Sequence, residues 1–470
     1  MVEAIEAAAR TARQPAGPRG LPLLGVAHAL RRDPLAYVLG LRACYGAAVR
    51  FRIGGNPILL LSDPEAIRHV LQDNHRNYHK SRFYRAFAPL LGGGIFMSEG
   101  ETWLAQRRTA NPSFAGVRFE RMAAEIAGAA DDMLRRWDRA GREDRGVAIV
   151  PEMMRVTLDG LTRAMFSLQL AGEHEVLHDA LTIILRRTER RVWALLPQPE
   201  WLAIRTDRRY RRALATTDRL VWRLIRDRRR EPSPPDDLLS ALIAASDPRD
   251  PRSERILRDQ IVSMIAAGHE STACALAWAF CMLARHPDVE RRLHAEADAA
   301  LGGRPPGFSD LGRLPFARMV LEETMRLYPP VWTISRLALA DDVAAGVPVP
   351  KGTTVMLSPY VVHRDPGLWP DPERFDPERF APGADRLRHR LAYFPFGGGP
   401  RVCLGNRFAI MEGQIILAMV AQRYRLTLAP DAGLVPEPMI TLRPQAGLRL
   451  GLVPRGARHH ERSEAGANSA

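Results

Sequence analysis

The chain has 470 residues, of which 46% are hydrophobic and 7% aromatic, a composition typical of a globular protein and not of a disordered one. The net charge of +14 comes almost entirely from arginine, yet no nucleic-acid-binding motif accompanies it. An acidic partner, anionic lipid or simply a GC-rich genome can account for this charge. The four cysteines, Cys44, Cys274, Cys281 and Cys403, form no C-x-x-C pair, which argues against zinc sites, iron–sulfur clusters and a disulfide scaffold.

The first hundred residues predict little regular structure apart from a hairpin. Met1–Arg13 is a helix-like piece without a long apolar run, so we expect neither a signal peptide nor a membrane anchor there. Prolines in Gln14–Pro22 break any helix. Two strands, Ala48–Ile53 and Ile58–Leu61, flank a Gly-Gly-Asn-Pro turn and predict the hairpin. Lys80–Gly100 is expected to be irregular.

Helical periodicity dominates the rest of the chain. The longest periodic segment, Ser253–Arg285, is apolar on several faces, as expected of a helix that crosses a large core. Helices with a minor β part predict a mainly α protein and not an alternating βαβ chain. The other predicted helices are Asp63–Asp73, Thr102–Arg108, Phe119–Arg139, Pro151–Leu168, Glu173–Trp193, Trp201–Arg229, Pro287–Ala300, Phe316–Tyr328 and Leu404–Tyr424. The other predicted strands are Val331–Ser335, Val347–Val349, Thr354–Leu357, Arg425–Leu428 and Gly447–Val453.

One cysteine, Cys403, lies in the glycine-rich segment Phe396–Gly405, just before an apolar helical run. Glycines allow tight turns, and backbone N–H groups together with Arg401 favour the thiolate over the thiol. Such a thiolate is either a nucleophile or a metal ligand. A nucleophile needs a histidine base, and no histidine lies near Cys403 in the sequence, although His363 or His389 could approach in space. A metal ligand needs no base, and a metal with one cysteine ligand would be held mostly by a group such as a porphyrin.

Two further segments carry charge inside apolar surroundings. Glu323 and Arg326 share a helix face, and their apolar flanks predict burial, which requires further partners such as Arg379. Trp103 and Arg107 are four residues apart on one helix face, where an indole N–H and a guanidinium suit a carboxylate. A surface cation–π pair is the simpler alternative for the second pair.

The long helix contains the sequence Ala-Gly-His-Glu-Ser-Thr, in which Gly268 weakens the helix by about 1 kcal/mol and would let a bulky group approach. Glu270, Ser271 and Thr272 form an acid followed by two alcohols, which is costly to bury. The alternative is a local helix flaw, with both hydroxyls bonded to carbonyls one turn earlier.

Together these residues resemble the cytochrome P450 superfamily, whose order of motifs the chain follows from about Gln14 to Pro454. The resemblance implies the P450 fold, with a flexible N-terminus over residues 1–13, a single haem domain over 14–454 and a disordered tail over 455–470. The residues that match the cysteine-loop signature are Phe396, Gly399, Arg401, Cys403 and Gly405. Those that match the helix pair and its completing arginine are Glu323, Arg326 and Arg379.

The resemblance implies haem b as the cofactor, with Cys403 as the ligand of the iron. Gly268 and Gly405 would lie against the haem, and Phe396 would pack beside the sulfur. The expected propionate anchors are Trp103, Arg107, Arg336 and Arg401.

The implied reaction is reductive activation of O2 and insertion of one oxygen atom into a C–H bond. Glu270 and Ser271 would relay protons, with Thr272 as a possible substitute. Most family members carry threonine where Ser271 stands, and serine lacks the β-methyl group that restricts χ1. We therefore expect a relay that releases more peroxide.

The positions that line the pocket in the family are nearly all apolar here, which favours a hydrophobic substrate such as a fatty acid, terpenoid, steroid or polyketide-like molecule. Arg82 and Arg85 give fatty acids a slight advantage, unless both are solvated. These pocket positions are Phe83, Phe87, Phe96, Met264, Ala267, Val331, Trp332, Ile334, Met439 and Ile440.

The chain contains no recognisable flavin or iron–sulfur segment, so we expect electrons from a separate ferredoxin and an NAD(P)H-dependent reductase. The protein is expected to be a cytoplasmic monomer without a transmembrane segment and without nucleic acid. The apolar segment 192–202 is expected to pack on the body, although it could touch a membrane. The alternatives are a peroxygenase or isomerase, which would not need the acid–alcohol pair, and a non-catalytic haem protein.

Overall fold

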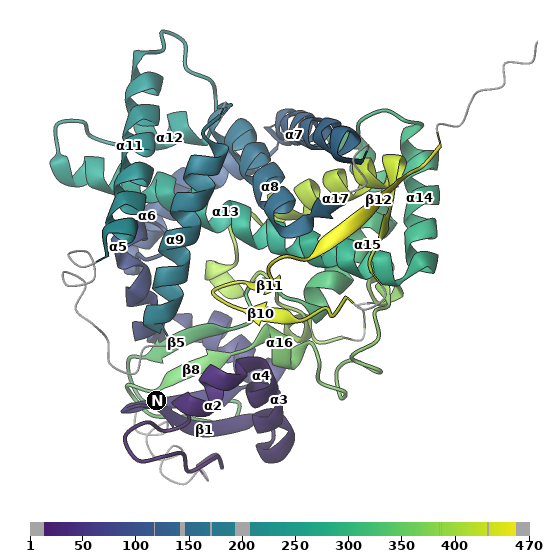
Figure 1. Cartoon of the computed structure of the whole chain (residues 1–470). Coiled ribbons are helices and arrows are strands. Elements are labelled where there is room, and N and C mark those ends of the chain that lie inside the picture. The colour runs from purple at the N-terminus through teal and green to yellow at the C-terminus, as the bar shows by residue number, and fades with distance from the viewer. Residues whose placement is uncertain are drawn as a thin grey trace, which may run out of the picture.

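The computed structural model describes most of the chain and shows a broad helical body above a smaller β region (Figure 1). The predicted helix-like N-terminus, the start of the helix predicted from Trp201, the segment from Trp193 and most of the tail lie outside the described residues. The described residues are 14–456 except 117, 142–145, 170–171, 193–206, 385, 387 and 430–431.

The helix α13 (Pro251–Arg285) crosses the middle of the helical body and organises it. Asp250 caps its N-terminus through the backbone N–H of Arg252, and Pro251 fits the first turn, where no intrahelical partner is needed. The helices packed against α13 include α8 (Ile149–Phe166), α15 (Pro315–Leu327) and α17 (Asn406–Arg423). The predicted mainly α fold with a minor β part is confirmed.

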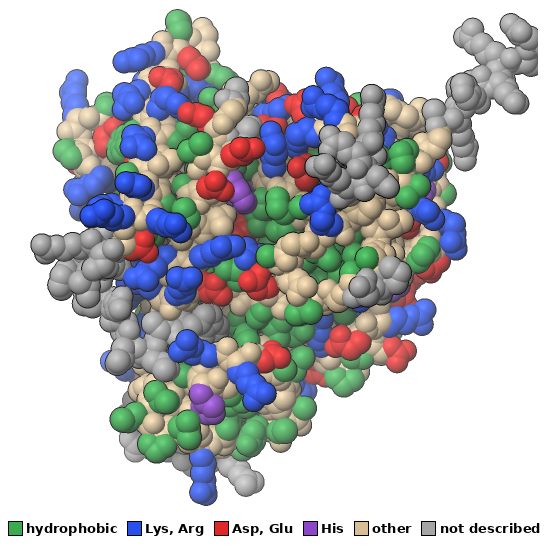
Figure 2. Space-filling view, in the orientation of Figure 1, with side chains coloured by type: hydrophobic (Ala, Val, Ile, Leu, Met, Phe, Trp, Pro, Cys, Tyr) green, Lys and Arg blue, Asp and Glu red, His purple; other side chains and the backbone are tan. Residues whose placement is uncertain are grey.

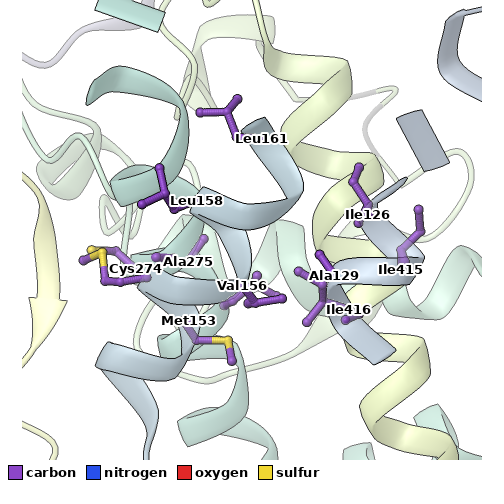
Figure 3. Close-up of a cluster of buried hydrophobic side chains, with 14 of the residues drawn as sticks. Ile126, Ala129, Met153, Val156, Leu158, Leu161, Cys274, Ala275, Ile415 and Ile416 are labelled. Atoms are coloured by element: carbon purple, nitrogen blue, oxygen red, sulfur yellow. The ribbon is translucent and has the colours of Figure 1, made fainter. Parts of the chain in front are cut away.

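The hydrophobic core lies where α7 (Arg118–Gly141), α8, α13 and α17 meet (Figure 3). Ile126 on α7, Val156 on α8 and Ile416 on α17 are fully buried there. Small residues on α13 such as Ala275 let α8 approach closely. This packing fixes the position of α13, and therefore of the acid and the two alcohols on it.

The β region contains a five-stranded sheet in the order β1-β2-β8-β5-β3. β1 (Ala48–Ile53) and β2 (Asn56–Leu61) form the predicted hairpin, with Val49 opposite Leu60. The smaller sheets are made of three strands and of two pairs of strands. The remaining strands are β3 (Tyr78–Lys80), β4 (Val147–Ala148), β5 (Ile334–Ala338), β6 (Asp342–Ala344), β7 (Val347–Val349), β8 (Thr354–Leu357), β9 (Tyr424–Thr427), β10 (Pro436–Pro438), β11 (Leu442–Pro444) and β12 (Arg449–Pro454).

Two predictions about local structure are wrong. Lys80–Gly100 is not wholly irregular, because it contains the 3-10 helix η3 (Arg82–Phe87) and α5 (Ala88–Leu91). The strand predicted at Val331–Ser335 begins only at Ile334, because the Trp332 indole N–H donates to the carbonyl of Met439 at 2.9 Å and holds this stretch out of the sheet. Three further helices were not predicted from the sequence: α2 (Ala27–Arg32), α3 (Pro34–Tyr45) and α12 (Leu238–Ala244).

The other predicted helices form with shifted ends, and the helix predicted at Asp63–Asp73 divides into α4 (Pro64–Arg68) and the π-helical turn η1 (His69–Asp73). None of the described helices combines the length and the apolar content that a membrane span requires. The remaining helices are α6 (Gly100–Ala110), α9 (His174–Val192), α11 (Arg208–Arg230), α14 (Pro287–Leu301) and α16 (Pro359–Val362).

Candidate active site

The cysteine loop is held in a single shape by its backbone. Gly397 and Gly399 have φ values of 74° and 64°, which side chains other than glycine rarely adopt. A Cβ atom on Gly399 would lie 1.9 Å from the carbonyl oxygen of Leu71, so η1 packs directly on the loop. The Cys403 N–H donates to the carbonyl of Phe396 at 2.9 Å and closes the turn. Two glycines and one hydrogen bond thus fix the direction of the cysteine.

Cys403 contributes its thiol to the wall of an internal cavity of about 470 Å³. Desolvation raises the pKa of this thiol, while the Gly405 N–H and the Arg107 guanidinium oppose the shift. The Gly405 N–H and Arg107 thus favour the thiolate, as expected from the sequence, while desolvation works against it. A bound cation at the sulfur would supply the missing charge, because coordination deprotonates a thiol.

Cationic side chains gather at the same end of the cavity. Arg107 donates to the Val402 carbonyl at 2.8 Å, and the Arg401 guanidinium lies 4.3 Å from the centre of the Trp103 ring. Arg336 lies on β5 and also lines the cavity. Lys80, which the sequence analysis missed, lies half-buried nearby, and desolvation followed by Arg401 lowers its pKa to about 7. An isolated lysine far from any motif offers no sequence signal.

These residues fit a haem. Three arginines and Lys80 face the cavity, and among the described residues only Glu99 is an acidic ion-pair partner for any of these cations, pairing with Arg401 and Lys80. Two propionate groups would balance the remaining positive charge. No group of three His, Cys, Asp or Glu side chains within the described residues could hold a metal by itself. The donor set therefore fits a macrocycle that brings its own ligands, with Cys403 as the protein ligand.

The acid and the two alcohols on α13 all line the cavity. Glu270 is buried and accepts a hydrogen bond from the Thr441 hydroxyl at 2.8 Å. Burial raises the pKa of Glu270, and the Thr441 hydroxyl opposes that shift. Ser271 donates to the Ala267 carbonyl at 3.0 Å, and Thr272 to the Gly268 carbonyl at 3.3 Å. Both hydroxyls are therefore bonded one turn back, as the simpler alternative anticipated, and both still face the cavity.

The structure gives a different reason for the glycine in this helix. A Cβ atom on Gly268 would lie 3.0 Å from the Leu161 side chain of α8. Gly268 lines the cavity, but its missing side chain makes room for α8. Close packing against α8 is thus a further reason for this glycine, and its predicted contact with a cofactor stays a prediction.

A second buried acid, Glu412 on α17, was missed by sequence reasoning. It is fully buried, and neither carboxyl oxygen has a hydrogen-bond partner among the described residues. Burial holds its pKa well above the usual range, and the nearby Thr272 hydroxyl only partly opposes this. Its position nine residues after Cys403 in an apolar helical run was the available signal.

The ion pair predicted on α15 is entirely enclosed. Arg326 donates to Glu323 through two bonds of 2.7 and 2.8 Å, and both side chains are 0% exposed. Arg379 reaches Glu323 at 3.5 Å. The remaining Arg326 donors bond backbone carbonyls of His363, Pro372 and Arg374, so the guanidinium clamps the chain that leads to the cysteine loop.

All ten pocket positions expected from the sequence line the cavity, whereas Arg82 and Arg85 do not. Arg82 bonds Asn56 and both arginines are exposed, which removes the slight advantage of fatty acids. His363 is fully buried, with its pKa lowered to about 3 by burial, and His389 is bonded to Glu65, so neither serves Cys403 as a base. The cavity also includes Glu189 on α9, which the sequence analysis overlooked.

Known proteins with similar sequences share this architecture. The chain is 37% identical over 424 residues to cyclooctat-9-en-7-ol 5-monooxygenase of Streptomyces melanosporofaciens, covering 89% of this chain and 90% of that protein. It is 33% identical over 446 residues to pentalenene oxygenase of Streptomyces avermitilis, covering 93% and 97%. The crystal structure of the cytochrome P450DA heme domain superposes with a TM-score of 0.83 at 26% identity, covering 95% and 98%.

These similarities agree with three features of the chain: the order of its motifs, the cysteine loop near α13 and the cationic end of the cavity. The family model for cytochrome P450 matches residues 15–450, nearly the full length of the chain. The chain therefore belongs to the cytochrome P450 family.

Proposed function

We propose that this haem-thiolate monooxygenase oxidises a hydrophobic terpenoid, with Cys403 as the ligand of the haem iron. One observation carries the proposal. A single cavity with a largely apolar wall is lined by Cys403, by the cationic side chains and by the acid and the two alcohols of α13. Relatives named for cyclooctat-9-en-7-ol and pentalenene favour a terpenoid over the other hydrophobic classes. The absence of Arg82 and Arg85 from the cavity wall disfavours a carboxylate-bearing substrate.

Haem b supplies the activation of O2 by two electrons, and a thiolate ligand increases the electron density available at the iron. This chain's own residues then have three tasks besides proton delivery. Trp103, Arg107, Arg336 and Arg401 hold the propionates, and we add Lys80 to this set. Phe396 and Gly405 shape the surroundings of the sulfur. Apolar residues such as Phe87 and Val331 exclude water and hold the substrate.

Proton delivery is the task of the acid and the two alcohols on α13, Glu270, Ser271 and Thr272. Glu270 is the proton donor, and burial raises the pKa of its carboxyl group, which favours the protonated form. Ser271 passes the proton on by rotating its hydroxyl away from the Ala267 carbonyl, and Thr272 does the same from the following position. Serine rotates more freely than threonine about χ1, which lowers the fraction of electrons that reach product.

Electrons come from a separate ferredoxin and its NAD(P)H-dependent reductase. The charge of +14 suits an acidic partner, and basic side chains are spread among acidic ones over one face of the molecule without forming a single patch there (Figure 2). We also propose a monomer in the cytoplasm, in keeping with four cysteines and no C-x-x-C motif.

The decisive experiment compares wild type with Cys403→Ala. The wild type is expected to show the thiolate-type absorption of a carbon monoxide complex and to make product with ferredoxin, reductase and NAD(P)H. Cys403→Ala is expected to lose that absorption while keeping its helical circular dichroism. Product formed with peroxide alone, and none with the electron-transfer chain, would favour a peroxygenase instead.

A further inference from the structure

One acidic side chain lies in the apolar part of the cavity without an evident role. Leu185, Glu189 and Val192 are spaced at i, i+4 and i+7 on α9, so they share one helix face, and all three line the cavity. Helix packing alone would place a third apolar residue at the middle position. Glu189 therefore interrupts an apolar stripe at the point where a bound molecule would touch it.

Glu189 has no hydrogen-bond or ion-pair partner within the described part of the chain, whereas the neighbouring Thr188 hydroxyl bonds the Ile184 carbonyl at 2.9 Å. Arg443, the cation that most strongly opposes the rise in the pKa of Glu189, already bonds Glu437 at 2.9 Å. A half-buried polar group without a partner costs free energy, unless a ligand supplies the missing bond.

The electrostatic surroundings favour the neutral acid. Burial raises the pKa of Glu189 to about 7, and Glu437 and Glu270 add to the rise, while Arg443 and Arg190 oppose it. A protonated carboxyl group can donate one hydrogen bond and accept another. That combination complements an alcohol, which also donates and accepts, better than an ammonium group, which needs an ionised partner.

Other unpartnered polar atoms in the wall are weaker candidates. The hydroxyls of Ser263 and Thr333 lie at the cavity without partners. The Ser263 oxygen, however, lies 2.2 Å from the place that a Cβ atom on Gly94 would take, so it is closed off by the loop. Thr333 offers one hydroxyl on an irregular segment beside β5. Glu189 is the larger polar group, and it lies on the regular face of α9.

We propose that Glu189 is a specificity-determining residue that binds a hydroxyl group of the substrate. The substrate is then a terpenoid alcohol, and an earlier oxygenation or water-quenched cyclisation must supply it. The inference rests on the proposed terpenoid function and adds to it the hydroxyl group of the substrate that the protein recognises. Glu189 positions the substrate from α9, while oxidation takes place near Cys403, which lines the same cavity.

The test uses the haem-loaded protein and matched pairs of ligands: polycyclic terpene alcohols such as cedrol, each with its deoxygenated hydrocarbon such as cedrane. Binding is measured by the shift of the haem absorption band on titration. We expect wild type to bind at least one alcohol about tenfold more tightly than its hydrocarbon, which corresponds to one hydrogen bond of about 1.4 kcal/mol.

Three variants separate binding from folding. Glu189→Leu is expected to abolish the preference for the alcohol and to bind the hydrocarbon at least as well as wild type. Glu189→Gln keeps a donor and an acceptor and is expected to restore most of the preference. Arg186→Gln, an exposed change on the same helix, is the control and is expected to leave the ratio unchanged.

Each remaining outcome overturns the inference in a recognisable way. An unchanged ratio in Glu189→Leu, or equal binding of both members of each pair by wild type, removes the role of Glu189 and leaves the terpenoid function intact. If a matched amine binds more tightly than the alcohol, Glu189 recognises a cationic group of the substrate and not a hydroxyl group. A lower yield of product per electron without a change in the ratio assigns Glu189 to proton supply. If no terpene binds at all, the proposed function fails and this inference fails with it.

Discussion

The Thr441 hydroxyl donates a hydrogen bond to the Glu270 carboxyl at 2.8 Å, joining the turn between β10 and β11 to the centre of α13. The Cys274 thiol in turn lies 3.5 Å from the same hydroxyl. Burial raises the pKa of Glu270, and the bond from Thr441 is the largest opposing contribution. A residue of the C-terminal β region thus tunes the acid that we assign to proton delivery.

Replacing Thr441 by valine tests this tuning. The variant keeps the side-chain shape and removes the hydroxyl, so the pKa of Glu270 rises further and the carboxyl ionises only at higher pH. Because Glu270 acts as the proton donor, its protonated form then persists to higher pH, and we expect the decline of turnover on the alkaline side to move to higher pH than in wild type. The measurement is the pH profile of NAD(P)H-dependent product formation. Thr217→Val, which removes a buried hydroxyl from α11, is the control.

Ser271 provides a second test, because it faces the cavity and, among the described residues, its hydroxyl bonds only the Ala267 carbonyl. Ser271→Ala removes the relay hydroxyl and is expected to lower the product formed per NAD(P)H consumed about two- to tenfold, with a matching rise in peroxide. Ser271→Thr keeps the hydroxyl, restricts χ1 and is expected to raise the same ratio above wild type. If Ser271→Ala keeps the wild-type ratio, the relay runs through Thr272 instead.

Much of the fold could be predicted because its motifs are local. α13 and the β1–β2 hairpin follow from periodicity and turn residues, which need no knowledge of distant contacts. Gly268 shows the limit, since a sequence reveals a weak point in a helix but not that Leu161 of another helix fills it. Glu189 and Glu412 were missed for the same reason: each is a single acid in a helical run, and only tertiary structure encloses it.

The buried pair of Glu323 and Arg326 is expected to control stability and not chemistry. Glu323→Gln leaves the Arg326 charge enclosed at 0% exposure, which typically costs about 3–5 kcal/mol. The measurements are urea unfolding and the haem content of the purified protein, both of which should fall. Glu322→Gln, one residue earlier, loses an ion pair to the largely exposed Arg318 and is expected to cost about 1 kcal/mol or less. Equal losses in both variants would show that burial does not set the cost.

We expect electron supply by the proposed ferredoxin to depend on the surface near the cysteine loop. Arg407 is exposed in the first turn of α17, four residues after Cys403, and pairs with no acid among the described residues. Arg108 is exposed on α6, directly after Arg107. Two cations so close to residues that hold the haem are suited to guide an acidic ferredoxin to the shortest path for an electron.

We therefore expect the rate of reduction by an acidic plant-type ferredoxin to fall steeply as salt rises from about 0.01 to about 1 M, because the screening length shrinks roughly tenfold over that range. Arg407→Glu should lower the rate at low salt and flatten the salt dependence, since it replaces attraction by repulsion. Arg226→Glu makes the same change in net charge on α11 and should leave the rate near that of wild type. Equal effects of the two variants would mean that net charge alone attracts the partner, and a rate independent of salt would contradict electrostatic steering altogether.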